Sequence, residues 1–281
     1  MQIEVSLNQC YILCRWANES DRPQSERCSQ ISGRRILINY ADGCCKLSQP
    51  YNCQTGLTTG GFDVCVQFNA QSIDSEFKKR NSMAFNSLAP SSKYWIWKPY
   101  IVWKTLHTMN ENDVLFYADS GSHFVDNFEL GPICLMAETN VDIAVFQYQQ
   151  QEKIHSKADA FLLMNCMEEK CQELPQLTAA FVLLRKTPRS LEFVSQWLTY
   201  AQDFRILNND PSQMVPDPQE FQGHRNDQSI ISILAKKWNL EQWPDPSQWG
   251  EITEFGRKVR GLPKFASRLN RTFINHTRKK I

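Results

Sequence analysis

The chain has 281 residues, of which 42% are hydrophobic and 22% charged, and its formal net charge at pH 7 is +1. These values are typical of a globular protein with a sizeable core, and a charge so near zero argues against nucleic acid as a partner. No stretch approaches the roughly 18–20 uninterrupted apolar residues of a membrane-spanning helix, and the N-terminus lacks the pattern of a signal peptide.

A polar N-terminal extension, residues 1–33, precedes the first predicted element. Short apolar runs between turn residues indicate buried strands, whereas apolar residues three or four apart indicate helices that cover a sheet. In chain order these patterns predict a strand at 36–38, a strand at 62–68, a helix at 72–89, a helix at 98–109, a strand at 113–118, a strand at 142–149, a helix at 157–167, a strand at 177–186, a helix at 187–204, a loop at 207–225 and a helix at 226–238.

Two of the predicted helices carry clear start signals. Thr187 is a good N-cap and Pro188 suits the first helical position, while Pro99 fits the first turn of the earlier helix. Strands that alternate with helices over some 200 residues predict an α/β fold, with a mostly parallel, Rossmann-like central sheet and helices on both faces. The loop at 207–225 is long for a compact domain, and such loops are often functional.

The predicted strand at 113–118 runs straight into Asp119, Ser120 and Gly121. Ligands of open parallel α/β sheets sit beyond the carboxyl ends of the strands, so Asp119 would point into that crevice. A glycine beside it would allow close approach to the backbone. A carboxylate there suits Mg²⁺ or Mn²⁺, and such a metal suits a diphosphate. Asp119 could equally cap the next helix, as could Ser120 or Ser122.

The ten cysteines and the basic C-terminus leave alternatives open. The cysteines are at positions 10, 14, 28, 44, 45, 53, 65, 134, 166 and 171. Without a secretion signal we expect reduced thiols and a cytoplasmic protein, although the spacing of two pairs, 10 with 14 and 166 with 171, loosely suits zinc. From residue 256 to the end there are nine Lys or Arg and no acid, which indicates either a solvated tail or a cationic wall facing phosphate.

Several sequence blocks resemble a signature of small glycosyltransferases with the GT-A fold, which occur in polysaccharide-synthesis loci and in large algal DNA viruses. The resemblance covers the chain from about Arg34 to Lys280, and its most specific blocks are Trp-Lys-Pro and His-Arg-x-Asp-Gln. The blocks are "SSKYWIWKPYIVWKTL" with "NDVLFYADSG", "INYADG", "GGFDVCVQF", "EKIHSKADAF", "LTAAFVLLRKTPRSLEFVSQWL", "FQGHRNDQSIISIL" and "INHTRKK".

This resemblance implies one GT-A glycosyltransferase domain at 34–281, with a nucleotide-sugar half at about 34–150 and an acceptor half at about 151–281. It implies metal ligation by Asp119 and His276, although Gly121 replaces the second aspartate of the usual DxD motif. The donor-binding residues that it implies are Tyr40, Ala41, Asp42, Asp63, Lys98, Asp119, Ser120, Gly121, Lys157, His224, Arg225, Gln228, Arg278 and Lys279.

The same resemblance suggests the groups that do the chemistry. Asp227, and Asp159 as a second candidate, are the catalytic carboxylates, and Trp95 and Gln176 are acceptor-binding candidates. Each has a structural alternative: Asp227 could anchor the sugar or cap its helix, and Trp95 could pack in the core. Likewise, Lys157 could lie at the surface, and His224 could pack against the long loop.

The function implied by the resemblance is transfer of a hexose or pentose from a UDP-sugar to a glycan or glycoprotein hydroxyl, with Mn²⁺ or Mg²⁺ as cofactor. UDP-xylose is the favoured donor, because the chain matches a viral xylosyltransferase in size; inversion is favoured over retention, and a viral enzyme would act in the host cytoplasm. The alternative is a non-catalytic nucleotide-sugar or carbohydrate-binding protein that keeps the fold. A zinc- or nucleic-acid-binding protein is a further, weaker alternative.

Overall fold

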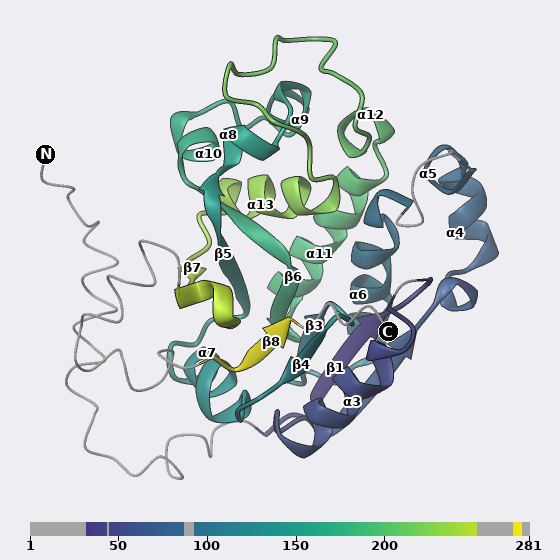
Figure 1. Cartoon of the computed structure of the whole chain (residues 1–281), viewed down its shortest axis with the longest axis vertical. Coiled ribbons are helices and arrows are strands. Elements are labelled where there is room, and N and C mark those ends of the chain that lie inside the picture. Colours follow the sequence, from purple (N-terminus) through teal and green to yellow (C-terminus); the bar gives the residue numbers. More distant parts are fainter. Residues whose placement is uncertain (1–31, 44, 87–92, 252–271, 277–281) are drawn as a thin grey trace, which may run out of the picture.

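The computed structural model describes residues 32–43, 45–86, 93–251 and 272–276 (Figure 1). The strands are β1 (Arg35–Tyr40), β2 (Val64–Phe68), β3 (Val114–Ala118), β4 (Ser122–Phe124), β5 (Ile143–Gln151), β6 (Pro175–Arg185), β7 (Gln242–Trp243) and β8 (Ile274–His276). The α-helices are α3 (Ser48–Thr58), α4 (Ser75–Arg80), α5 (Ser82–Asn86), α6 (Trp97–Thr108), α7 (Cys134–Glu138), α8 (Glu152–His155), α9 (Ala158–Leu163), α10 (Glu169–Glu173), α11 (Pro188–Ala201), α12 (Phe204–Leu207) and α13 (Asp227–Lys237).

The central sheet has six strands in the order β2-β1-β3-β6-β5-β7, and β4 pairs with β8 in a separate two-stranded sheet. Within the large sheet β1 is parallel to β2 and β3, and β5 is parallel to β7, whereas β6 runs antiparallel to both of its neighbours. The predicted α/β fold with a mostly parallel sheet is therefore confirmed, and β6 is the strand that reverses direction.

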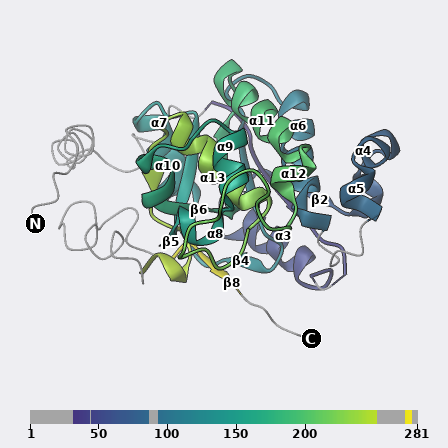
Figure 2. The same cartoon turned by 90° about the horizontal axis from the view of Figure 1, so that it is seen from above.

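Alternating side chains of each strand fill two cores, one on each face of the sheet. On one face Ile36 and Leu115 pack with helices α6, α11 and α13. On the other face Leu37 and Phe116 pack with residues from α7, β4 and β8. Period-two alternation explains this division, because successive residues of a strand point to opposite faces. In Figure 2, α6 and α11 lie on one side of β5 and β6, and β4 and β8 lie on the other.

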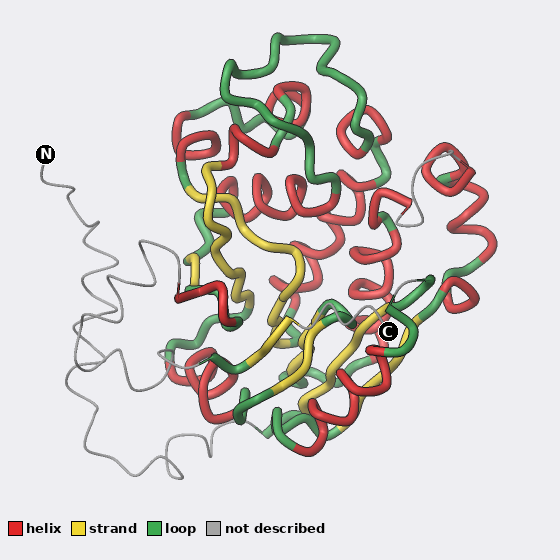
Figure 3. The backbone as a smooth tube through the Cα atoms, in the orientation of Figure 1, coloured by secondary structure: helices red, strands yellow, loops and turns green. Residues whose placement is uncertain are grey.

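Most of the elements predicted from apolar patterns are present within a few residues of their expected bounds. Helix α11 begins with a capping box, in which the Thr187 side chain accepts from the Ser190 amide and Pro188 takes the first helical position. Pro99 lies in the first turn of α6. The predicted loop at 207–225 contains no helix or strand after α12, and Figure 3 shows it as a long green segment above α8 and α9.

The expectation of reduced thiols is wrong for two cysteine pairs. Cys53 of α3 is disulfide-bonded to Cys65 of β2, and Cys166 is bonded to Cys171 of α10, with Cα–Cα distances of 5.6 and 5.9 Å. These bonds cross-link a helix to the edge strand and close a short loop. Among the described residues no helix has the length and apolar composition to cross a membrane.

Candidate active site

Three charged side chains from distant parts of the chain meet at the carboxyl end of β3. The ammonium of Lys98 lies 3.1 Å from Asp227 Oδ2 and 3.6 Å from Asp119 Oδ1, and it donates to the carbonyl of Ala179 at 3.0 Å. The side chains of Lys98 and Asp227 are 4% and 3% exposed, whereas that of Asp119 is 41% exposed. The cluster thus consists of a buried lysine, a buried carboxylate and one carboxylate that reaches solvent.

The fold places each of these groups at the end of an element. Asp119 is the first residue after β3, as predicted, and its amide donates to Ala180 of β6 at 2.9 Å. Lys98 lies in the first turn of α6, and Asp227 is the first residue of α13. Both helices cover the same face of the sheet, so their amino ends bring two charges of opposite sign together.

The electrostatics of the cluster favour a proton-transfer role for Asp227. Burial raises the pKa of Asp227 to about 6, against the opposing effect of the Lys98 ammonium. Within the described residues its Oδ2 atom has no hydrogen bond of good geometry, although the ion pair with Lys98 contacts it. A buried carboxylate oxygen without a hydrogen bond is unusual, and a hydroxyl donor from a ligand would satisfy it.

The turn after β3 is fixed by hydroxyl groups. Ser120 donates to the Tyr40 carbonyl at 2.7 Å, and the Ser122 hydroxyl donates to the Asp119 carbonyl at 2.6 Å. The Tyr40 ring stacks on Trp97, with centroids 3.7 Å apart. A Cβ added at Gly121 would meet nothing within 4 Å. The turn is therefore rigid on its protein side and open beside Gly121, where a ligand could approach the backbone.

The two residues predicted as metal ligands, Asp119 and His276, both lie near the turn that follows β3. One oxygen of Asp119 accepts from the Tyr117 hydroxyl at 2.7 Å, while its Oδ2 receives no hydrogen bond from the described part of the chain. His276 of β8 pairs with Ser122 and its ring lies against Phe181, with centroids 5.1 Å apart, so it belongs to the same edge of the fold. No cluster of three candidate ligands occurs in the described residues, so a divalent cation at this edge would need further oxygen ligands from a bound molecule or water.

Helix α3 supports this turn through a buried polar network that the sequence did not reveal. The Asn52 amide donates to the Ser122 carbonyl at 2.9 Å and accepts from Asn39 at 2.7 Å. Gln49 donates to Asn39 and to the Phe68 carbonyl. No apolar stripe marks this face of α3, so periodicity gave no signal; only the amide residues themselves could have indicated it.

The donor-site prediction for Asp63 is wrong. Asp63 precedes β2 and forms a paired salt bridge with Arg35 at the start of β1, at 2.6 and 2.9 Å. Parallel strands share their polarity, so this is the edge of the sheet opposite to Asp119. Ala41 is buried, and its amide donates to the Phe68 carbonyl at 3.1 Å. Asp42 is exposed next to Ala41, 3.7 Å from Lys46, and remains at the candidate edge.

Three further predicted residues bind the protein itself. Both oxygens of Asp159 accept from loop amides at 213–215; burial opposes ionisation, but these amide donors hold the pKa of Asp159 below its usual value. Lys157 is buried and its ammonium donates to Asn208 at 2.6 Å. His224 bridges the Lys157 amide and the Ile206 carbonyl, and burial lowers its pKa to about 3. These contacts anchor the long loop and leave Asp159 and Lys157 no free face for a substrate.

Next to Asp227 the structure separates an outer glutamine from an inner one. Gln228 is half-buried and donates to Gln176 at 2.8 Å. Gln176 is completely buried, so the prediction that it contacts the acceptor is wrong. Arg225 lies over the Tyr148 ring at 4.3 Å and donates to the Tyr148 hydroxyl. Gln228 and Arg225 thus remain candidates for ligand contact.

Trp95 lies in an unusual turn that leads into α6. Lys93, Tyr94 and Trp95 have φ values of 47°, 55° and 56°, which is the left-handed region that L-residues avoid. Trp95 is 38% exposed, whereas Trp97 is buried in the helix, so the ring of Trp95 is the one that reaches the surface. Arg278 and Lys279 lie outside the described residues.

In a plot of the sugar-transfer rate against pH, we expect Lys98→Met to move the fall at acidic pH to a higher pH. A carboxylate acts as a base only when it is ionised, so a sugar-transfer rate that depends on Asp227 as base should fall as the pH drops through about 6. Lys98 lowers the pKa of Asp227, and its removal therefore raises it. The measurement is kcat against pH, with Lys104→Met, an exposed lysine of the same helix, as control. A fall at an unchanged pH would show that Lys98 does not tune Asp227.

No protein-family model matches the sequence, and no curated protein matches it. Among solved structures, mouse xyloside xylosyltransferase 1 is similar over 87% of this chain and 97% of its own, with 10% identity and a TM-score of 0.47. The bifunctional glycosyltransferase WbbM is similar over 87% of this chain and 46% of its own, with 9% identity and a TM-score of 0.49. An active-site mutant of LgtC is similar over 86% of both chains, with 12% identity and a TM-score of 0.42. At these TM-scores the likenesses carry no part of the proposal below.

Proposed function

We propose that the protein is a metal-dependent glycosyltransferase that moves a sugar from a UDP-sugar to a hydroxyl group of a glycan. The observation that carries this proposal is the cluster at the carboxyl end of β3, where buried Lys98 lies between Asp227 and the half-exposed Asp119. The sequence blocks that resemble GT-A glycosyltransferases contain all three residues. The placement agrees with the rule that such sheets bind ligands beyond their carboxyl ends.

Each member of the cluster has a distinct task in this proposal. Asp119 and His276 hold Mn²⁺ or Mg²⁺, which when bound stabilises negative charge on the diphosphate. Asp227 accepts the proton of the acceptor hydroxyl, which suits an inverting transfer. Lys98 is bound to both carboxylates and is too buried to meet the diphosphate directly, so we assign it to holding Asp119 and Asp227 in place.

The donor sugar and the compartment depend on other observations than the cluster at the end of β3. UDP-xylose stays the first donor to test, on the sequence resemblance alone. The two disulfides are typical of an oxidising compartment, so the cytoplasmic location expected from the sequence is not carried into the proposal.

A panel of UDP-sugars tests the proposal. We expect UDP release with at least one donor and a carbohydrate acceptor, dependent on Mn²⁺ or Mg²⁺ and abolished by chelation with EDTA. GDP- and dTDP-sugars serve as matched controls. Turnover that is unaffected by EDTA would remove the metal from the proposal, and UDP binding without turnover of any donor would remove catalysis.

The second candidate function is a non-catalytic protein that binds nucleotide-sugars. Gly121 stands where the DxD motif has its second carboxylate, and the described residues contain no cluster of three metal-ligating side chains. Both observations favour it. The buried, partly unsatisfied Asp227 favours the enzyme, because a binding protein has no need of a carboxylate with a pKa near 6.

A further inference from the structure

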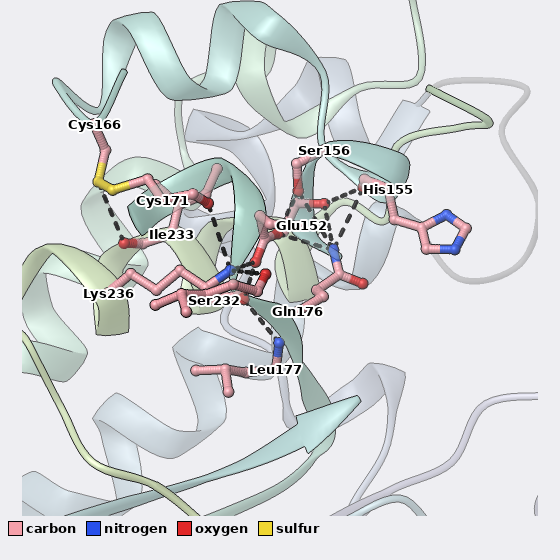
Figure 4. A network of polar contacts seen from close by, with 12 residues as sticks. Glu152, His155, Ser156, Cys166, Cys171, Gln176, Leu177, Ser232, Ile233 and Lys236 are labelled. Carbon is pink, nitrogen blue, oxygen red and sulfur yellow. Dashed lines mark hydrogen bonds and ion pairs between the residues drawn. A yellow bond between two sulfur atoms is a disulfide. The ribbon is translucent and has the colours of Figure 1, made fainter. Parts of the chain in front are cut away.

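A completely buried ion pair lies behind the candidate site, where the proposed reaction does not use it (Figure 4). The ammonium of Lys236 on α13 donates to Glu152 Oε2 at 2.6 Å, and both side chains are 0% exposed. Lys236 also donates to the carbonyls of Leu174 and Cys171. Burying two charges costs more than their attraction usually returns unless every polar atom is satisfied. The effect of this pair therefore depends on the groups that its two charges contact.

The carboxylate of Glu152 accepts four donors. Its Oε2 atom takes Lys236 and the Ser232 hydroxyl, and its Oε1 atom takes the Ser156 hydroxyl and the Gln176 amide, the last at 3.0 Å. Figure 4 shows the Gln176 side chain pointing at this carboxylate from the neighbouring strand. A carboxylate can only accept, so the amide nitrogen of Gln176 must face Glu152.

The orientation that Glu152 imposes on the Gln176 amide in turn orients the Gln228 amide. With its nitrogen turned to Glu152, Gln176 presents Oε1 to Gln228, which donates to it at 2.8 Å. The Oε1 atom of Gln228 is left to accept from the Ala179 amide, at the longer distance of 3.3 Å. Each amide in this series is held in one of its two flip states by the group behind it. The half-exposed Gln228 is the end of the series, directly beside Asp227.

We propose that Glu152, neutralised by Lys236 and acting through Gln176, is a positioning residue that fixes the orientation of the Gln228 amide at the active site. This inference rests on the proposed function and on the donor-binding role that the sequence resemblance implies for Gln228. The fixed amide has one Nε2 proton committed to Gln176 and a second proton available. The site therefore offers the substrate an N–H donor at this position, and selects for a group that accepts, such as a sugar hydroxyl or ring oxygen.

The first experiment measures the amide directly and needs no activity. Side-chain protons of Gln228 are followed by NMR exchange with water in ¹⁵N-labelled protein, with the signals assigned by their loss in Gln228→Glu. Gln176→Met keeps the ion pair and breaks the series, and the double variant Glu152→Gln with Lys236→Met removes both charges together. We expect exchange about five- to tenfold faster in Gln176→Met, which removes one hydrogen bond to Gln228. We expect faster exchange in the double variant too, because the Gln176 amide is then no longer held in one orientation. Unchanged exchange in both variants would overturn the inference.

The second experiment uses kinetics to separate positioning from stability. Gln176→Met and the charge-free double variant should each lower kcat about five- to tenfold with little change in the donor KM, and the triple variant should be no slower than either. Multiplying effects on kcat would show that Glu152 does not act through Gln176.

A second ion pair that shares only helix α8 with the first controls for non-specific effects. Lys153 of α8 pairs with Glu173 of α10 at 2.8 Å, and Glu173 is 40% exposed. Lys153→Met with Glu173→Gln should change neither Gln228 exchange nor kcat. If no donor is turned over, the exchange measurement still decides the positioning role; if transfer proceeds and exchange is unchanged, only the positioning role fails.

Discussion

Asp227→Asn should lower sugar transfer by about 10²–10⁴-fold, the usual contribution of a general base, while leaving UDP affinity nearly unchanged. Asparagine keeps the size of the side chain and can still contact Lys98, but it cannot take a proton from a hydroxyl group. The measurements are kcat with the best donor and a UDP titration by calorimetry. Wild-type turnover by this variant would remove Asp227 from the chemistry.

A control and a pH test separate catalysis from folding. Asp203→Asn alters an acid that caps α12 and pairs with Arg205, and it should keep transfer. Burial raises the pKa of Asp227 from 3.8 to about 6, against the opposing effect of Lys98, so this group makes the folded protein more stable as the pH falls through that window. The asparagine variant lacks the effect, and its melting temperature relative to wild type should decline between about pH 7 and pH 5.

Asp119→Asn should abolish the part of UDP binding that depends on a divalent cation. The variant keeps an acceptor for the Tyr117 hydroxyl but loses the negative charge that a hard cation requires. With UDP at a hundred times its Kd, the wild type should gain about 2.7 kcal/mol of stability, and the gain should vanish in the variant with Mn²⁺ present. Differential scanning fluorimetry with UDP, with and without Mn²⁺, provides the measurement.

The matched control lies just before the other end of the same strand. Glu111 is exposed in the turn that precedes β3, and Glu111→Gln should respond to UDP and Mn²⁺ as the wild type does. An equal manganese-dependent shift in Asp119→Asn would place the cation elsewhere. A loss of all UDP binding, with and without metal, would instead mean that the substitution distorts the turn.

The sequence predicted the layers of the fold and the position of Asp119 because both depend on local patterns. A buried strand needs a continuous apolar run, and the carboxyl edge of a parallel sheet follows from chain direction alone. Asp63 was misplaced because a local pattern does not show where strand pairing starts. The apolar run around Asp63 begins at Phe62, but pairing with β1 begins only at Val64.

What the sequence could not show is which distant groups meet. Lys98 and Asp227 are far apart in the chain, and only the packing of α6 and α13 on one face brings them together. Helix α3 escaped prediction because the face that it buries carries amides such as Asn52, where an apolar stripe would be expected. Asp159 and Gln176 resembled site residues by type, but hydrogen bonds to the protein's own backbone and side chains occupy them.

The antiparallel strand β6 contributes main-chain hydrogen bonds to the site, and most substitutions in the strand would retain them. The Ala179 carbonyl accepts from Lys98, its amide donates to Gln228, and the Ala180 carbonyl accepts from the Asp119 amide. All three are main-chain groups, so any residue whose side chain fits at 179 or 180 retains them, proline apart at 179. Attempts to redirect such an enzyme to new donors should therefore vary the side chains around this strand, because its main chain would act as a constant template through rounds of mutation.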